Sequence, residues 1–496
     1  MEPRSEVVED KSVKTEATAS KKVFIETWGC QMNVADSEQM LSLLQARDYV
    51  TTTSAEDADL VLLNTCHIRE KATHKVLSRL GRLRQMAEKN PGMKIAVTGC
   101  VAQAEGEKLL KKADNIDILL GPGKIAELPQ LIDAHAASGR AVSALGFLKG
   151  RGDDEAVASV AGAHYHPPME SALDTVKPTV SGKTEITRYV NIAQGCDNFC
   201  TFCVVPFTRG REVSRTASDI VREAQTLIAD GCKEITLLGQ NVNSYGQDLL
   251  SPPEKEIMTG DNGSAPFVSL LESVVQLPGL ERLRFTTSNP HDFTRPLAEL
   301  FARYPKLGRY IHLPVQAGND EVLERMKRKV TVASYLERID WLRAIDPEMA
   351  LSTDLIVGFP GETDEQFADT LALVAKVRYS FIYAFKYSPR KGTAAMRFRE
   401  QVEEAAKTER LAALNALQDS ITLKQNRAEI GRTRQILCHY ESRKEPGTFY
   451  GRTEQFRLVK VASDRNLLGE TVSVVIEDAN KTALIGRLTA PSAMFQ

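Results

Sequence analysis

The stretch GCDNFCTFCVVPFTRGRE, residues 195–212, contains three closely spaced cysteines. Cys196, Cys200 and Cys203 follow the spacing C-x-x-x-C-x-x-C. This spacing lets one short loop wrap an iron–sulfur cubane and ligate three of its irons, which leaves the fourth iron without a protein ligand. A zinc knuckle is the rival interpretation, but zinc sites close with four ligands and no fourth ligand lies nearby. The loop therefore predicts a cluster with one open iron.

The segments around this loop alternate between strand-like and helix-like patterns. The strand-like runs are RYVNIAQ (188–194), ITLLGQNV (235–242), RLRFTT (282–287), IHLPVQ (311–316), STDLIVGF (352–359) and FIYAFKYSP (381–389). Six such βα units predict a partial parallel barrel over residues 182–412. Functional residues of such barrels lie where the strands end, so we expect Gly239, Gln240 and Asn241 beside the cysteine loop.

Three strand-like runs nearer the N-terminus each lead to a cysteine. KVFIET (22–27) precedes Cys30, LVLLNTC (60–66) ends at Cys66 and KIAVTGC (94–100) ends at Cys100. We expect an open, mostly parallel α/β sheet over residues 21–138, which brings the three thiols to one edge. They are candidate ligands of a second iron–sulfur cluster. A zinc site completed by His67 or His74 is the alternative.

Composition limits the remaining possibilities. The 496 residues carry a formal net charge of −2 and are 42% hydrophobic, which predicts several globular domains and only local nucleic-acid contacts. No apolar run is long enough to span a membrane, so we expect a cytoplasmic chain with no membrane partner. Residues 1–20 are expected to form a disordered leader and 139–181 a linker. The lone Cys232 and Cys438 are expected to be core residues.

A helical, charged stretch is expected from Val402 to Glu429, and after it the last domain, assigned to residues 415–490, continues as short β-like runs: TRQILCHY, FRLVKV, ETVSVVIED and TALIGRLTA. A small closed or nearly closed β-barrel is expected, a fold that often binds oligonucleotides. Residues 427–496 contain 11 Lys and Arg against 8 Asp and Glu, a weak basic excess. Charge alone fits a protein-contact module as well as an RNA-binding one.

The cysteine loop resembles that of the radical S-adenosylmethionine (SAM) superfamily, and the C-terminal segment, with GRTEQF (451–456) as its central turn, resembles a TRAM domain. Together with WGCQMNVADSE, NTCHIRE, LLGQNVNSYG, HLPVQAGND, DLIVGFPGET and YSPRKGTAA, the chain resembles the MiaB family of tRNA-2-methylthio-N(6)-dimethylallyladenosine synthases. The resemblance covers nearly the whole chain outside the leader and the linker. Residues 249–266 are interpreted as an insertion.

This resemblance implies two 4Fe–4S clusters, one held by Cys30, Cys66 and Cys100 and one by Cys196, Cys200 and Cys203. One SAM would methylate a sulfur held at the first cluster, and a second SAM, cleaved at the other, would supply a 5′-deoxyadenosyl radical. An unactivated aromatic C–H bond offers no acidic proton, so a cofactor radical is the reasonable solution for this substitution. The expected SAM contacts are Phe202, Gly239, Gln240, Asn241, Gln316, Asp354 and Gly358, with His312 pointing toward the same mouth.

The implied substrate is the prenylated adenosine at position 37, next to the tRNA anticodon, and Gln31, Met32 and Asn33 are its expected contacts. An electron donor and a sulfur donor are further expected partners of a monomeric enzyme. Two alternatives stay open: a methylthiotransferase acting on a ribosomal-protein aspartate or on threonylcarbamoyladenosine in tRNA, and a non-catalytic RNA-binding protein with structural clusters.

Overall fold

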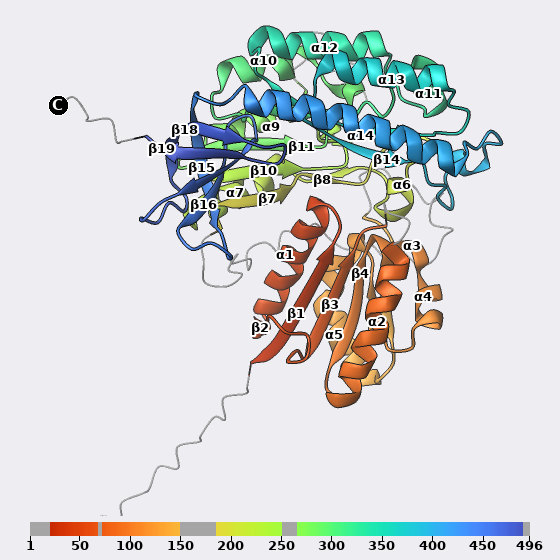
Figure 1. Ribbon diagram of the computed structural model, residues 1–496. Coiled ribbons are helices and arrows are strands. Elements are labelled where there is room, and N and C mark those ends of the chain that lie inside the picture. The colour runs from red at the N-terminus through yellow and green to blue at the C-terminus, as the bar shows by residue number, and fades with distance from the viewer. Residues whose placement is uncertain (1–19, 68–71, 149–184, 250–264, 490–496) are drawn as a thin grey trace, which may run out of the picture.

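The computed structural model describes residues 20–67, 72–148, 185–249 and 265–489, which form three units in contact with one another (Figure 1). An N-terminal α/β unit lies below a central barrel in this view, and a small β-barrel adjoins the side of the central one. Nearly all of the predicted leader, and most of the predicted linker and insertion, lie outside the described residues. No helix in the described ranges is long and apolar enough to cross a membrane.

The N-terminal unit is a six-stranded sheet in which every neighbouring pair is parallel. Its strand order is β2-β1-β3-β4-β5-β6. The strands are β1 (Lys21–Trp28), β2 (Tyr49–Thr51), β3 (Leu60–Thr65), β4 (Lys94–Gly99), β5 (Ile118–Leu120) and β6 (Val142–Ala144). The open parallel sheet expected from the sequence is therefore confirmed, and it continues through β6, beyond the expected end of this domain at residue 138.

Helices cover both faces of this sheet, because its strands are apolar on both sides. Leu60 and Leu62 of β3 pack in one core and Val61 and Leu63 in the other. The first core is closed by α1 (Gln31–Gln45), the 3₁₀ helix η1 (Pro122–Glu127) and α5 (Leu128–Ser138). The second core is closed by α2 (Ala72–Lys89), α3 (Cys100–Glu105) and α4 (Glu107–Lys112). Burial on both faces explains the nearly continuous apolar runs of these strands.

The central unit has the six parallel strands that the sequence predicts, arranged as two sheets of three, β11-β10-β7 and β12-β13-β14. The strands are β7 (Thr187–Asn191), β10 (Glu234–Leu238), β11 (Arg282–Thr286), β12 (Tyr310–His312), β13 (Ala350–Val357) and β14 (Phe381–Lys386). The helices are α7 (Ala217–Ala229), α9 (Pro266–Val275), α10 (Arg295–Arg303), α11 (Asp320–Arg325), α12 (Val332–Ile345) and α13 (Asp364–Val377). A parallel bridge between Leu283 and Leu307 joins the two sheets at β11 and β12, which leaves β7 and β14 as the outer strands.

The C-terminal unit is a closed five-stranded barrel of order β15-β16-β17-β19-β18. Its strands are β15 (Thr433–Glu441), β16 (Thr448–Arg452), β17 (Leu458–Ala462), β18 (Thr471–Ala479) and β19 (Leu484–Leu488). The predicted barrel is confirmed, but strand β16 was missed. The expected turn 451–456 begins inside β16, because a short strand containing Gly451 has the local composition of a turn.

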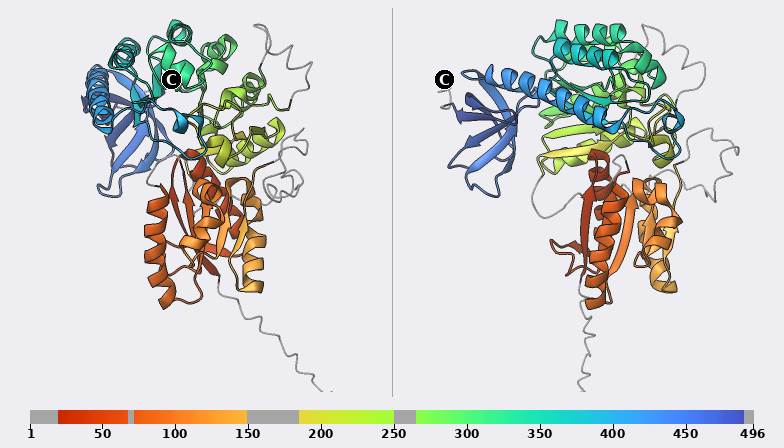
Figure 2. Two further views of the ribbon diagram at one scale, coloured as in Figure 1. Left: turned by 90° about the vertical axis from the view of Figure 1, so that its right-hand side faces the viewer. Right: turned by 45° about the vertical axis from the view of Figure 1, so that its right-hand side comes forward.

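A single helix, α14 (Glu404–Arg427), joins the central and C-terminal units. It packs against α13 and β14 and reaches β18 at its other end. Figure 2 shows the helix lying along the central barrel and ending at the small barrel. The helix continues without a break through residues 412–415, where the sequence suggested a domain boundary.

Candidate metal and nucleic-acid site

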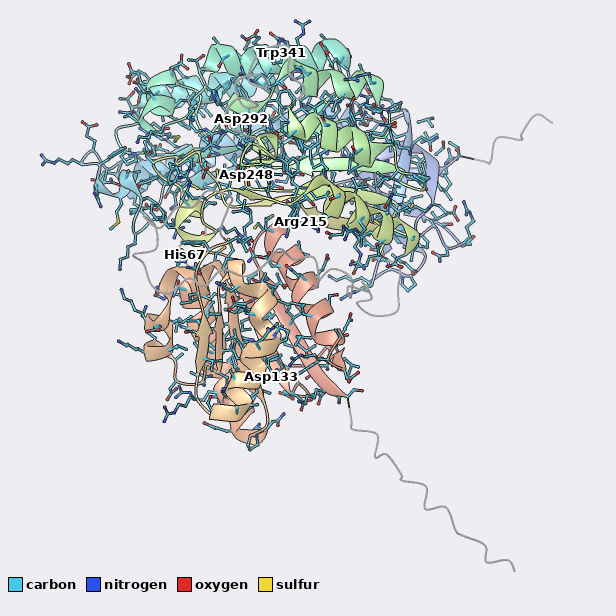
Figure 3. The ribbon with its side chains drawn as sticks, turned by 180° about the vertical axis from the view of Figure 1, so that it is seen from behind. His67, Asp133, Arg215, Asp248, Asp292 and Trp341 are labelled. Atoms are coloured by element: carbon cyan, nitrogen blue, oxygen red, sulfur yellow. The ribbon has the colours of Figure 1, made fainter. Side chains whose placement is uncertain are left out.

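A cavity of about 2560 Å³ lies where the three units meet. The two sets of cysteines are both in its wall: Cys30, Cys66, Cys100, Cys196, Cys200 and Cys203. Further residues of all three units and of α14 complete the wall. Figure 3 shows His67 at the edge of the N-terminal unit that faces the central barrel, whereas Asp133 lies toward the opposite end of that unit.

The N-terminal cysteines follow three neighbouring strands. Cys30 precedes the first residue of α1, Cys66 follows β3, and Cys100 is the first residue of α3 after β4. The crossover direction of the sheet reverses between β1 and β3, the point at which such sheets bind ligands. Gly29 allows the first two strand ends to approach, because a Cβ there would lie 2.7 Å from the Cβ of Cys66.

A pair of asparagines holds these strand ends together. Asn33 Nδ2 donates to Asn64 Oδ1 at 3.0 Å, and Asn64 Nδ2 donates to the backbone oxygen of Asn33 at 2.7 Å. Asn33 is fully buried, so the expectation that it faces substrate is corrected: its amide is used to position the first turn of α1. Gln31 faces the cavity and hydrogen-bonds the Tyr189 hydroxyl, while Met32 packs against Leu238 and Tyr189 of the central barrel.

The N-terminal thiols are in a positive environment. A hydrogen bond with Cys66 lowers the pKa of the Cys30 thiol to about 6, and the Arg209 guanidinium contributes to this shift. Burial raises the pKa of the Cys100 thiol, and the positive charge of Arg209 opposes this shift. Thiolates are the form that ligates iron, so a cation beside two of the three thiols fits a cluster at this edge.

The cysteines of the central loop each accept one N–H hydrogen bond. Asn198 Nδ2 lies 3.5 Å from Cys196 Sγ, the Val205 amide nitrogen 3.5 Å from Cys203 Sγ, and Arg328 Nη1 3.4 Å from Cys200 Sγ. Burial raises the pKa of Cys203 to about 12 and also raises that of Cys196. A metal-free thiolate is therefore unfavourable here, whereas N–H donors aimed at all three sulfurs suit thiolates that ligate a cluster.

A single-ion site is absent from the described part of the chain. No group of three or more His, Cys, Asp or Glu side chains there could hold one metal ion. A cubane differs, since it takes its thiolates at separate iron corners and does not need the sulfurs to converge on one point. Burial lowers the pKa of His67, which lies near Arg390, and no described group places it or His74 in a zinc site.

The residues expected at the second strand end all line the cavity, but two of them are bound to the protein itself. Gln240 Oε1 accepts a hydrogen bond from the Gly195 amide at 2.5 Å. Asn241 Nδ2 donates to Asp292 Oδ2 at 2.6 Å, and its Oδ1 accepts from the Asn289 amide at 3.1 Å. These side chains fix the loops around the site, while Gly239 contributes backbone to the wall.

The later candidates divide into cavity residues and one packing residue. Phe202, Gln316, Asp354 and His312 line the cavity, with His312 Nε2 3.5 Å from Asp354 Oδ1. Gly358 does not belong to the wall: its φ is +69°, and a Cβ there would lie 2.3 Å from Cγ of Lys407. Close backbone approach at Gly358 is therefore real, but the approaching group is Lys407 of α14.

The sequence interpretation missed an aromatic surface on β14. Tyr383 and Phe385 alternate along this outer strand and line the cavity, yet 49% and 40% of their surfaces are exposed. The Tyr383 ring lies edge-on to His312 with 5.6 Å between centroids. The i, i+2 spacing of aromatic residues in FIYAF is the signal that could have found this surface.

The C-terminal barrel closes another part of the cavity. Arg284 donates to the backbone oxygens of Thr453 and Glu454 at 3.0 and 3.1 Å, and Phe456 stacks on Tyr310 with 4.8 Å between centroids. The Arg452 guanidinium also lies over the Phe456 ring, 4.0 Å from its centroid. The turn after β16 is thus anchored in the wall of the central barrel.

Comparisons with known proteins agree with this architecture. Residues 22–121 match the Uncharacterized protein family UPF0004, and residues 190–374 match the Radical SAM superfamily. The chain is 41% identical over 471 residues to the tRNA-2-methylthio-N(6)-dimethylallyladenosine synthase of Geotalea uraniireducens, covering 95% of this chain and 99% of that one. The enzyme of the same name from Geobacter sulfurreducens is 41% identical, with 95% and 98% covered.

A solved structure supports the fold. The radical S-adenosylmethionine methyltransferase TsrM from Kitasatospora setae aligns with a TM-score of 0.52 at 14% identity, over 76% of this chain and 74% of that one. At this identity the likeness concerns the fold alone.

Proposed function

The chain belongs to the tRNA-2-methylthio-N(6)-dimethylallyladenosine synthase family, and from this premise we propose that it attaches a methylthio group to C2 of a prenylated adenosine at position 37 of tRNA. The single observation that carries the proposal is the shared cavity. Two sets of three cysteines from different units face it, together with exposed aromatic side chains and a part of the C-terminal barrel. A binding module with structural clusters would not need both sets to face one cavity.

The cysteine sets have different roles in this proposal. Cys196, Cys200 and Cys203 hold the 4Fe–4S cluster of a radical SAM enzyme, and Cys30, Cys66 and Cys100 hold the second cluster. When bound, these groups and SAM supply the radical, the sulfur and the methyl group of the reaction. Arg328 supports the first set by its contact with Cys200 Sγ. Phe202, Gly239, Gln316 and Asp354 are the candidate contacts of SAM, because they line the cavity around the loop.

The substrate base enters the barrel between its outer strands, β7 and β14. Tyr189 of β7, held by Gln31, and Tyr383 of β14 both line this opening. Bases in a single-stranded loop can leave the stack and rest on aromatic side chains, which is how RNA sequence is usually recognised. Phe385 adds apolar surface for the prenyl chain, whose five carbons contribute at most roughly 0.8 kcal/mol each on burial.

The C-terminal barrel holds the body of the tRNA. Its Tyr440, Arg443 and Arg452 line the same cavity, so they offer a ring and two cations to the RNA chain beside the target base. The enzyme acts as a monomer in the cytoplasm, where tRNA is found, and draws on a reducing electron donor and a sulfur donor.

The proposal is tested by an anaerobic reaction of the purified enzyme with SAM, a reductant, and either prenylated or unprenylated tRNA. Mass spectrometry of the nucleosides should find the 2-methylthio product only with prenylated tRNA, and 5′-deoxyadenosine in the same reactions. Equal yields of the 2-methylthio product from both tRNAs would show that the enzyme does not recognise the prenyl group. Product on threonylcarbamoyladenosine or on ribosomal protein would identify a sister methylthiotransferase, and no 5′-deoxyadenosine at all would identify a binding module.

A further inference from the structure

Arg209 and Asp36 form a buried ion pair between the central and N-terminal units. Arg209 Nη2 lies 2.6 Å from Asp36 Oδ2, and only 3% of each side chain is exposed. Asp36 belongs to α1, whose first turn follows Cys30. Arg209 follows the short helix α6 (Val205–Thr208), which itself begins two residues after Cys203, and its amide donates to the Val205 oxygen at 2.7 Å. One short segment thus carries both a cysteine of the central loop and this arginine.

Within the described ranges, the Arg209 guanidinium has an unpaired N–H donor near the N-terminal thiols. Its Nη1 is buried and has no hydrogen-bond partner among the described residues. Its positive charge acts on the thiols of both Cys30 and Cys100, which line the cavity with it. A buried guanidinium with an unused N–H is costly, so an acceptor is expected beside it. Besides Asp36, the groups whose charge acts on Arg209 are the thiols of Cys100 and Cys30.

Stability alone does not account for this pair. Replacing a buried ion pair by apolar side chains of similar size is often neutral or stabilising, because the charges lose their hydration on burial. Arg209 also lines the cavity, together with the cysteines of both units. A cation at this point favours negative charge on the group that the N-terminal trio holds, and charge and hydrogen bonds to sulfur are what set the reduction potential of such groups.

We propose that Arg209 is a positioning residue for the group held by Cys30, Cys66 and Cys100: its free Nη1 donates to a sulfur of that group, while the pair with Asp36 fixes the two cysteine sites relative to each other. This inference rests on the proposed function, in which the N-terminal trio supplies the sulfur. Arg209 would then connect the segment that carries Cys203 with the sulfur that the N-terminal cluster transfers to the substrate.

The decisive variant is the double substitution Arg209→Met with Asp36→Leu, which removes both charges without leaving one unpaired. The matched control is Arg47→Met with Asp133→Leu, an ion pair of 2.8 Å in the same unit whose acid lies toward the opposite end from the cysteines (Figure 3). Each is made in the full chain, and again in a chain whose Cys196, Cys200 and Cys203 are alanine, so that only the N-terminal cluster contributes to the spectrum.

Two readouts are measured against the control. Redox titration followed by electron paramagnetic resonance should show a more negative midpoint potential for the N-terminal cluster of the double variant. In the full chain, the ratio of methylthio product to 5′-deoxyadenosine should fall about tenfold, as is typical when a group supporting a metal ligand is lost. Arg209→Lys, which keeps a positive charge, should restore part of both.

A double variant with the potential and product ratio of the control would overturn the proposal. Should the double variant fail to hold its N-terminal iron, Arg209→Lys decides: a near-native potential supports the role of the charge, and a variant as impaired as the double one shows that the arginine is only structural. Failure of the proposed function is separately visible, since it would leave the unaltered enzyme without methylthio product while the potentials remain measurable.

Discussion

Gln240 holds the cysteine loop from below, because its Oε1 accepts a 2.5 Å hydrogen bond from the amide of Gly195, the residue before Cys196. Gln240→Leu should loosen this loop and lower the rate of reductive SAM cleavage about tenfold, the typical cost of losing a group that orients a metal ligand. The rate is measured as 5′-deoxyadenosine formed anaerobically. Gln276→Leu, at the exposed end of α9, is the control. An unchanged rate in Gln240→Leu would show that the bond does not support the loop.

The three loop cysteines should be individually indispensable for radical formation. Cys196→Ala, Cys200→Ala or Cys203→Ala should each abolish SAM cleavage, since two thiolates should not hold an open-iron cubane in a reducible form. Cys232→Ala is the matched control, because this thiol is buried in the core of the same barrel. 5′-Deoxyadenosine from any of the three loop variants would contradict the cluster assignment.

The N-terminal cysteines should separate the two activities. Replacing Cys30, Cys66 and Cys100 together should leave SAM cleavage measurable while eliminating the methylthio product, because only the sulfur-bearing site is lost. Iron analysis should fall from about eight to about four per chain, as expected for one remaining four-iron cluster. Normal product from the triple variant would contradict this division of labour.

The aromatic surface on β14 should determine how tightly the substrate base is held. Tyr383→Ala and Phe385→Ala should each weaken binding of a prenylated anticodon stem-loop by about 1–3 kcal/mol, the usual value of a base stacked on an aromatic ring. Fluorescence anisotropy measures this without turnover. We expect Phe385→Ala to reduce the preference for prenylated over unprenylated RNA. Tyr440→Ala, on the C-terminal barrel, should weaken both RNAs equally; an unchanged preference in Phe385→Ala would place the prenyl chain elsewhere.

Glu212 should make the folding stability depend on pH. Burial raises the pKa of its carboxyl to about 8, against a hydrogen bond from Ser244 and with the help of Asp248. The folded chain therefore keeps this proton between pH 4.5 and 8 while the unfolded chain has lost it, so the free energy of unfolding falls as pH rises through this range. Urea unfolding should show that the free energy of unfolding of Glu212→Gln, relative to that of the parent chain, increases as pH rises through this range. The control Glu299→Gln should show no such increase.

The order of elements could be read from the sequence because hydrophobic period and turn residues act locally. The strands that end near Cys30, Cys66 and Cys100 were recognisable, and parallel topology then brings their ends to one edge. Strand β16 escaped because its five residues include a glycine and no alternation long enough to count. Local pattern decides such short strands poorly, and closure of the barrel by its neighbours decides them instead.

The roles of single polar side chains were much harder to predict. Gln240 and Asn33 belong to segments that suggested ligand contacts, yet the structure pairs them with Gly195 and Asn64. Arg209 and Asp36 went unnoticed because they meet across 173 residues of chain. The available signal was that each lies six residues after a cysteine of its own set. Contacts between units depend on how those units dock, and a local pattern carries no information about docking.

The helix α14 spans about 36 Å at 1.5 Å per residue and meets the C-terminal barrel at one end, while the anchored turn at Phe456 holds that barrel a second time. Because it is attached at two points, the C-terminal barrel has a fixed orientation relative to the central barrel. The entropy cost of orienting this barrel is met during folding, so it does not weaken the binding of RNA. If this barrel holds the body of the tRNA, as proposed, a tRNA whose anticodon stem is one base pair longer or shorter should bind less tightly, because the fixed distance between the barrel and the cavity would no longer match the RNA.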